Sequence, residues 1–194
     1  MHDAVAHSCN AYFAQLALRL GPNAMLDMAS RLGIAVAAPN SVERLRATLP
    51  QAGYGQGDVV ATPLRMARLA AALASGGVLP ETRWDARPSG PPKTDVLLPP
   101  EAAELLARYM RDVVLTGTGR SLSTHPWRIA GKTGTAELSG SPSHAWFVGF
   151  APYGAATKRI AFAIILENAG YGGRAAAPVA GEIVTAAAAA GLVR

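Results

Sequence analysis

The stretch that decides the fold is RIAGKTGTAEL, residues 128–138. Its Gly131-Lys132-Thr133 matches the end of a phosphate-binding P-loop, whose full pattern is G-x-x-x-x-G-K-[ST] between a strand and a helix. The first glycine of that pattern would stand at position 126, which is proline. Proline lacks the backbone N–H that such a loop directs at phosphate. The residues after Thr133 continue as a strand towards SGSPS, so we exclude a P-loop and expect a β-strand.

The segments that follow this stretch also have β character. WRIAGKTGTAEL, HAWFVGFAPY and RIAFAIILEN are rich in β-branched and aromatic residues, and the short linkers SGSPS and GAATK separate them. This order predicts two successive antiparallel connections. The chain then closes with APVAGEIVTAAAAAGLV, residues 177–193, a predicted helix whose small side chains suit close packing on a sheet.

The part of the chain before this stretch is mainly helical. Apolar residues recur at helical spacing in four segments, and glycine or proline ends each of them. Residues 34–61 and 78–100 are expected to be irregular or loops. The predicted fold class is α+β, an antiparallel sheet packed by helices. We expect one domain over residues 1–194, with a mainly helical part (1–120) and a β-meander with a closing helix (121–194). The four predicted helices are residues 11–20, 23–32, 62–75 and 100–115.

Composition excludes several classes of protein. The 194 residues are 50% hydrophobic and 16% charged, which is typical of a globular domain and not of a disordered chain. The formal charge of +5 comes from scattered residues without a basic run, so a solvated basic surface is favoured over nucleic-acid binding. A single cysteine allows no internal disulfide. We expect no metal site and no cofactor. We find no signal or membrane-spanning segment, so any membrane anchor must come from sequence outside this chain.

Two short patterns have the chemistry of a peptide-binding site. On an edge strand, Lys132 would supply positive potential, the Thr133 hydroxyl would hold a carboxylate, and Gly134 would allow close approach of a ligand. The N–H of Thr135 would donate to a developing oxyanion. Ser8-Cys9-Asn10 forms an S-x-N triplet before a helix. Taken alone, that triplet is better explained by helix capping.

Four patterns in this order resemble the transpeptidase domain of class B penicillin-binding proteins, in particular the penicillin-binding protein A type of actinobacteria. The resemblance covers nearly the whole chain and is far more specific than any one pattern. K-T-G, with S-x-x-K and an S-x-N-like triplet, is a signature of penicillin-binding proteins and class A β-lactamases. The matching segments are SCNAYFAQLALRLG, GQGDVVATPLRMA, GKTGTA and AWFVGFAP.

The resemblance implies a role in peptidoglycan cross-linking. Members of this family take a stem peptide that ends in D-Ala-D-Ala, form an acyl-serine and pass the acyl group to an amine, and β-lactams trap that serine. By this resemblance Ser8 relays a proton and Asn10 holds a substrate amide, while Lys132, Thr133 and Thr135 bind the substrate. The implied location is the extracytoplasmic face of the bacterial plasma membrane.

One element of the family pattern is missing from the sequence. No serine is followed by lysine three residues later, so S-x-x-K is absent from these 194 residues. We therefore expect the chain to begin after the nucleophile of its family and to be unable to form an acyl-enzyme alone. Two alternatives remain open: a non-catalytic module that binds peptidoglycan peptide or β-lactam, and a β-lactamase or D,D-carboxypeptidase on the same fold.

Overall fold

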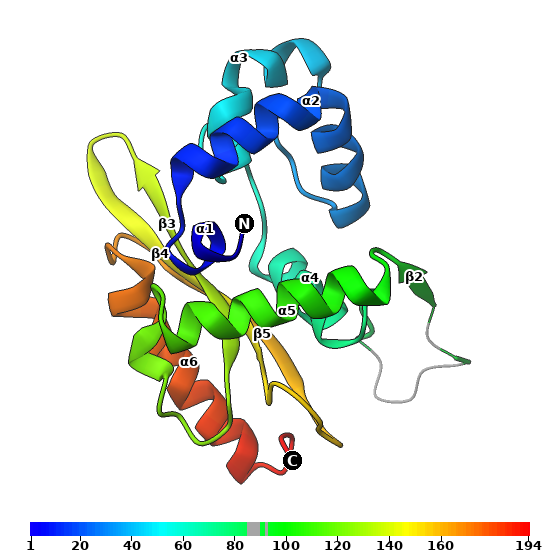
Figure 1. The fold of residues 1–194 in the computed structure, drawn as a ribbon, viewed down its shortest axis with the longest axis vertical. Helices are drawn as coiled ribbons and strands as arrows, with labels where there is room; N and C mark the ends of the chain where they lie inside the picture. Colours follow the sequence, from blue (N-terminus) through cyan, green and yellow to red (C-terminus); the bar gives the residue numbers. More distant parts are fainter. Residues whose placement is uncertain (85–89, 92) are drawn as a thin grey trace.

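A three-stranded antiparallel sheet lies between helices in the computed structural model, which describes residues 1–84, 90–91 and 93–194. Figure 1 shows α2 and α3 grouped beyond one end of the sheet. The elements in chain order are α1 (His2–Ala6), α2 (Asn10–Leu32), α3 (Val42–Gly53), α4 (Pro63–Ala74), β1 (Val78–Pro80), β2 (Thr94–Val96), α5 (Pro100–Leu115), the 3-10 turn η1 (Arg120–Leu122), β3 (Ala130–Leu138), β4 (Ser141–Ala151), β5 (Ile160–Leu166) and α6 (Gly172–Ala189).

The main sheet has the strand order β3-β4-β5, which confirms the predicted meander. β3 pairs with β4 from Ala130 opposite Phe150 to Ala136 opposite His144, and an irregularity follows before the turn. β3 lies at one end of this order. Within the described residues no strand pairs with its outer edge. The strand that contains the K-T-G residues is therefore an edge strand.

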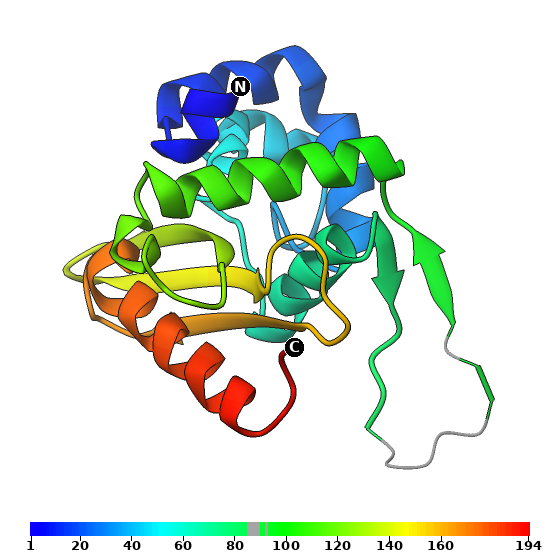
Figure 2. The same ribbon diagram turned by 60° about the horizontal axis from the view of Figure 1, so that its bottom comes forward.

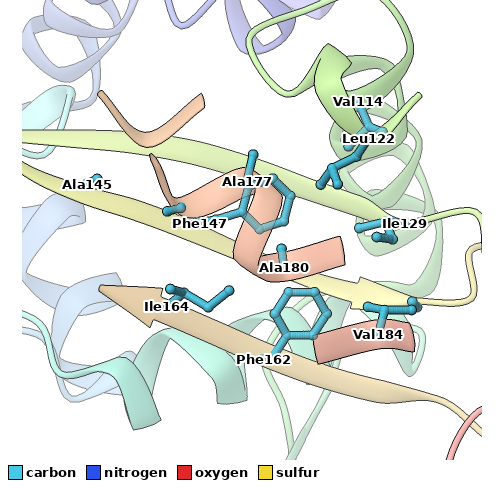
Figure 3. Close-up of a cluster of buried hydrophobic side chains, with 12 residues drawn as sticks. Val114, Leu122, Ile129, Ala145, Phe147, Phe162, Ile164, Ala177, Ala180 and Val184 are labelled. Carbon is cyan, nitrogen blue, oxygen red and sulfur yellow. The ribbon is translucent and has the colours of Figure 1, made fainter. Parts of the chain in front are cut away.

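The two faces of the sheet support different helices, because successive side chains of a strand point to opposite sides. Phe147 of β4 packs with Phe162 of β5 under α6, where Ala177 and Ala180 allow the helix to approach the sheet closely (Figure 3). Phe150 of β4 points to the other face and packs against α4 and α5. Figure 2 shows α5 and α6 on opposite sides of the strands.

The predicted helices are present, with changes at their ends. The expected break at Gly21-Pro22 is a kink within α2, where Gly21 has φ 78°. α6 begins at Gly172 instead of residue 177 and contains Pro178 as its seventh residue, where proline removes the helical hydrogen bond to the carbonyl four residues earlier. No helix in the described part of the chain is long and apolar enough to cross a membrane.

Two segments expected to be irregular contain regular structure. α3 forms within residues 34–61, because Ser41 caps its start by accepting from the Arg44 N–H, and Leu45 and Leu49 bury against α2. That burial outweighs the hydrogen bond lost at Pro50. Within 78–100, β1 and β2 pair as a short antiparallel ribbon. Residues 85–89 and 92 of that predicted loop lie outside the described residues.

Candidate active site

An open cavity of about 1150 Å³ lies at the outer edge of β3, and all six residues proposed from the sequence line it. Ser8 comes from the turn before α2, Asn10 is the first residue of α2, and the K-T-G residues come from β3. The end of α5, the η1 turn and the start of α6 complete the wall. The six residues are Ser8, Asn10, Lys132, Thr133, Gly134 and Thr135.

Ser8 lies in the tight turn that joins α1 to α2. Its backbone has φ 55°, a conformation that is uncommon for a residue with a side chain. The end of α1 is fixed against the end of α5, because the Thr118 N–H donates to the Ala6 carbonyl at 3.1 Å and Gly117 leaves room for this approach. Cys9 is the N-terminal cap residue of α2, with no side-chain capping bond. The Ser8 hydroxyl therefore does not cap the helix and is available to the cavity.

Lys132 joins the two patterns through its ammonium group. Its Nζ donates to the Ser8 Oγ at 2.8 Å and to the Thr133 carbonyl oxygen at 2.7 Å. Burial of this group lowers the lysine pKa from 10.5 to about 8. At neutral pH Lys132 is still mostly charged, but its pKa is close enough to ambient pH for proton exchange with a neighbouring hydroxyl. The Ser8–Lys132 pair has the geometry of a short proton path.

Thr133 and Gly134 are held by packing as well as by their position on β3. Thr133 is a buried residue, and its hydroxyl lies 2.6 Å from the hydroxyl of Thr118 in a partly buried contact. A Cβ added to Gly134 would lie 3.0 Å from the Cβ of Trp146 on β4. Glycine at this position therefore has a structural reason in addition to the close approach of a ligand predicted from the sequence.

Thr135 is contacted from both sides. Its hydroxyl accepts a long hydrogen bond of 3.4 Å from the N–H of Gly172, the first residue of α6. Its carbonyl oxygen accepts from the Nε2 of Gln56 at 3.0 Å. The β-meander and the helical part of the chain therefore meet at this residue.

Sequence reasoning missed several residues of the cavity. Gln56 belongs to the quoted GQG pattern, but the pattern gave it no role. Thr118 follows the end of α5, and no sequence pattern gave it a role. Arg120 and Arg174 also line the cavity, and with Lys132 they give three cations against one carboxylate, that of Glu137. The scattered basic residues thus include a cluster suited to an anionic ligand.

The match to a family model decides the classification. The model of the penicillin-binding protein transpeptidase domain matches residues 1–185. This chain belongs to that transpeptidase family. The resemblance stated from the sequence motifs is therefore confirmed.

Sequence comparison with individual proteins identifies the same family. The chain is 30% identical over 217 residues to the peptidoglycan D,D-transpeptidase PbpA of Mycobacterium tuberculosis, covering 96% of this chain and 43% of that protein. It is 30% identical over 221 residues to the peptidoglycan D,D-transpeptidase MrdA of Acinetobacter baumannii, covering 91% of this chain and 33% of that protein. The chain thus spans less than half the length of these curated relatives.

Solved structures show the same fold. The structure of PBPA from M. tuberculosis superposes with a TM-score of 0.78 at 28% identity, over 96% of this chain and 48% of that one. A chain of a peptidoglycan synthase complex that coordinates polymerization and crosslinking gives a TM-score of 0.84 at 28% identity, over 95% of this chain and 37% of that one. The mixed helix and antiparallel-sheet plan predicted from the sequence is that of transpeptidase domains.

Proposed function

We propose that this transpeptidase domain supplies the S-x-N and K-T-G part of a serine D,D-transpeptidase site that cross-links peptidoglycan. The observation that carries the proposal is the 2.8 Å hydrogen bond between Lys132 Nζ and Ser8 Oγ at the wall of a basic edge-strand cavity. A carboxylate-terminated peptide suits this cavity, because an edge strand offers backbone pairing and the cations favour a terminal carboxylate. We propose a single domain, in which the helical part provides Ser8 and Asn10.

Each proposed site residue has a distinct role with a stem peptide that ends in D-Ala-D-Ala. The hydroxyls of Thr133 and Thr135 bind the terminal carboxylate, in the positive potential of Lys132. The Asn10 side chain holds a peptide amide, and the Thr135 N–H donates to the oxyanion of the tetrahedral intermediate. The pair Ser8–Lys132 delivers a proton to the departing D-alanine amine. β-Lactams occupy the same positions because their carboxylate and amide imitate those of the peptide.

The acylating serine is the part of this chemistry that these 194 residues do not contain. In S-x-x-K one helical turn brings the lysine amine within reach of the serine proton. Since no serine here has that spacing, we propose that the nucleophile comes from sequence outside the 194 residues. By its likeness to the family, we also propose that the working enzyme acts at the extracytoplasmic face of the plasma membrane.

The absence of S-x-x-K from this sequence favours one second candidate, a module that binds peptidoglycan peptide without chemistry. Both functions use the same contacts at Asn10 and Thr133. They differ only in whether the native gene product forms an acyl-serine.

Fluorescent penicillin separates the two functions. The 194-residue chain should show no label that survives denaturation, whereas the product of the native gene should be labelled on the serine of an S-x-x-K segment. Stoichiometric label on Ser8 of the 194-residue chain would overturn the proposed roles. A native product that binds diacetyl-Lys-D-Ala-D-Ala without ever being labelled would establish the binding module instead.

A further inference from the structure

The outer edge of β3 is already occupied by two side chains of the same domain. Carbonyl groups two residues apart on a strand point to the same edge. The Thr133 carbonyl accepts from Lys132 Nζ at 2.7 Å, and the Thr135 carbonyl accepts from Gln56 Nε2 at 3.0 Å. These are the acceptors that an added peptide strand would use. Side chains of the protein itself therefore occupy these acceptors on the edge of β3.

The side chain that bonds the Thr135 carbonyl comes from a tight turn. Gln56 lies in the turn that follows α3, and its N–H donates to the Gln51 carbonyl at 3.0 Å. Gly55 and Gly57 on either side have φ of 83° and 71°, which a residue with a Cβ rarely adopts. This backbone directs the Gln56 side chain towards β3, and rotation of that partly buried side chain would release the Thr135 carbonyl.

We propose that Gln56 is a specificity-determining residue of this site. Its carboxamide donates a hydrogen bond to the Thr135 carbonyl. This bond breaks when the main-chain N–H of a ligand donates to the same carbonyl instead. The inference rests on the proposed function, since it assumes that peptide adds along β3. It implies discrimination: a ligand with an amide N–H at this position must displace Gln56, whereas a ligand that uses only the carboxylate contacts need not.

The first test compares binding constants of three forms of the chain. Gln56→Ala should bind diacetyl-Lys-D-Ala-D-Ala about fivefold more tightly than the unmodified chain, because the peptide no longer has to break the hydrogen bond between Gln56 and Thr135. A fivefold change in the binding constant corresponds to the net free energy of one hydrogen bond. Binding of free D-alanine, which has a carboxylate but no acyl amide, should not change. Gln51→Ala removes an exposed glutamine five residues earlier in α3 and should match the unmodified chain. Unchanged or weaker peptide binding by Gln56→Ala would overturn the inference.

The second test observes the contact directly in the unmodified chain. Scalar coupling across the bond from Gln56 Nε2 to the Thr135 carbonyl should be present in the free domain and disappear with saturating peptide. If the peptide shifts Ser8, Lys132 and Thr133 while the coupling persists, the inference fails and the proposed function stands. If the peptide shifts none of these residues at millimolar concentration, the proposed function fails and the inference fails with it.

Discussion

The Lys132 ammonium donates to the Ser8 hydroxyl across 2.8 Å at a position where burial lowers the lysine pKa to about 8. Desolvation disfavours the charged form, while the Ser8 oxygen favours it by accepting a hydrogen bond from the ammonium. The pKa of Lys132 is therefore a sensitive measure of the geometry on which the proposed proton path depends.

The contribution of Lys132 to the unfolding free energy should change with pH between about pH 8 and pH 10.5. In that range an unfolded chain binds a proton at Lys132 and the folded domain does not, so folding stability rises with pH. Below pH 8 the folded domain carries the full cost of the buried charge, up to about 3 kcal/mol. Lys132→Met should therefore stabilise the domain at pH 7 and remove this part of the pH dependence. Urea unfolding at pH 7 and pH 10 measures both effects.

Lys93→Met is the matched control for that experiment, because Lys93 is exposed and lies in the segment that connects β1 to β2. It should leave the difference between pH 7 and pH 10 unchanged. A Lys132→Met variant with the same pH dependence as the unmodified chain would contradict the depressed pKa.

Removing the Ser8 hydroxyl should lower the Lys132 pKa further. Ser8→Ala leaves the ammonium buried but takes away one of its hydrogen-bond acceptors, so the neutral form of Lys132 becomes more favourable relative to the charged form. Titration of the Lys132 side-chain resonances by NMR gives the pKa in both forms. The same titration of Ser121→Ala, which removes another hydroxyl from the cavity wall, should give a Lys132 pKa near the unmodified value. A rise in pKa on Ser8→Ala would show that the hydroxyl does not accept from the ammonium.

The hydroxyls of Thr118 and Thr133 should be energetically coupled. They lie 2.6 Å apart, and Thr133 is buried. Thr133→Val should cost about 1 kcal/mol of unfolding free energy, because the bond is lost and a hydroxyl remains without its partner. In the double variant with Thr118→Val the costs should not add, and a double-mutant cycle should give a coupling of about 1 kcal/mol. Additive costs would show that the two hydroxyls act independently.

Gly172 should tolerate no side chain. A Cβ at this position would lie 2.2 Å from the Gly134 carbonyl oxygen and 2.4 Å from that of Trp146, so α6 would have to move away from the sheet. Gly172→Ala should cost at least about 2 kcal/mol of unfolding free energy. At Gly119 the nearest atom to an added Cβ is 3.4 Å away, and Gly119→Ala should change stability by less than about 0.5 kcal/mol. Denaturant unfolding of both variants makes the comparison.

Sequence patterns predicted the sheet well because its determinants are local. The strands around Lys132 and Trp146 show β-type composition, and short linkers allow only antiparallel connections. The same patterns missed α3, because Pro50 and nearby glycines suggest irregular structure. Its stability comes from the burial of Leu45 and Leu49 against α2, a tertiary contact that no local pattern contains.

The candidate site could be predicted only where a known pattern named its residues. Ser8, Asn10 and the four residues from Lys132 to Thr135 line one cavity, as the S-x-N and K-T-G patterns led us to expect. Gln56 and Thr118 act through contacts with residues distant in the sequence. Composition gives no signal for such contacts, so the structure was needed to find them.

The bond between Ser8 and Lys132 joins residues 124 positions apart, and that between Gln56 and Thr135 spans 79. Contacts between distant parts of a chain are costly in loop-closure entropy and tend to form late in folding. α2 and α3 already share a cluster of buried side chains, so they have a core before β3 is synthesised. We therefore expect α2 and α3 to assemble first in the growing chain, and the cavity to be complete only when β3 closes onto them. Variants that delay this closure will reduce the yield of competent protein without altering any residue that a ligand touches.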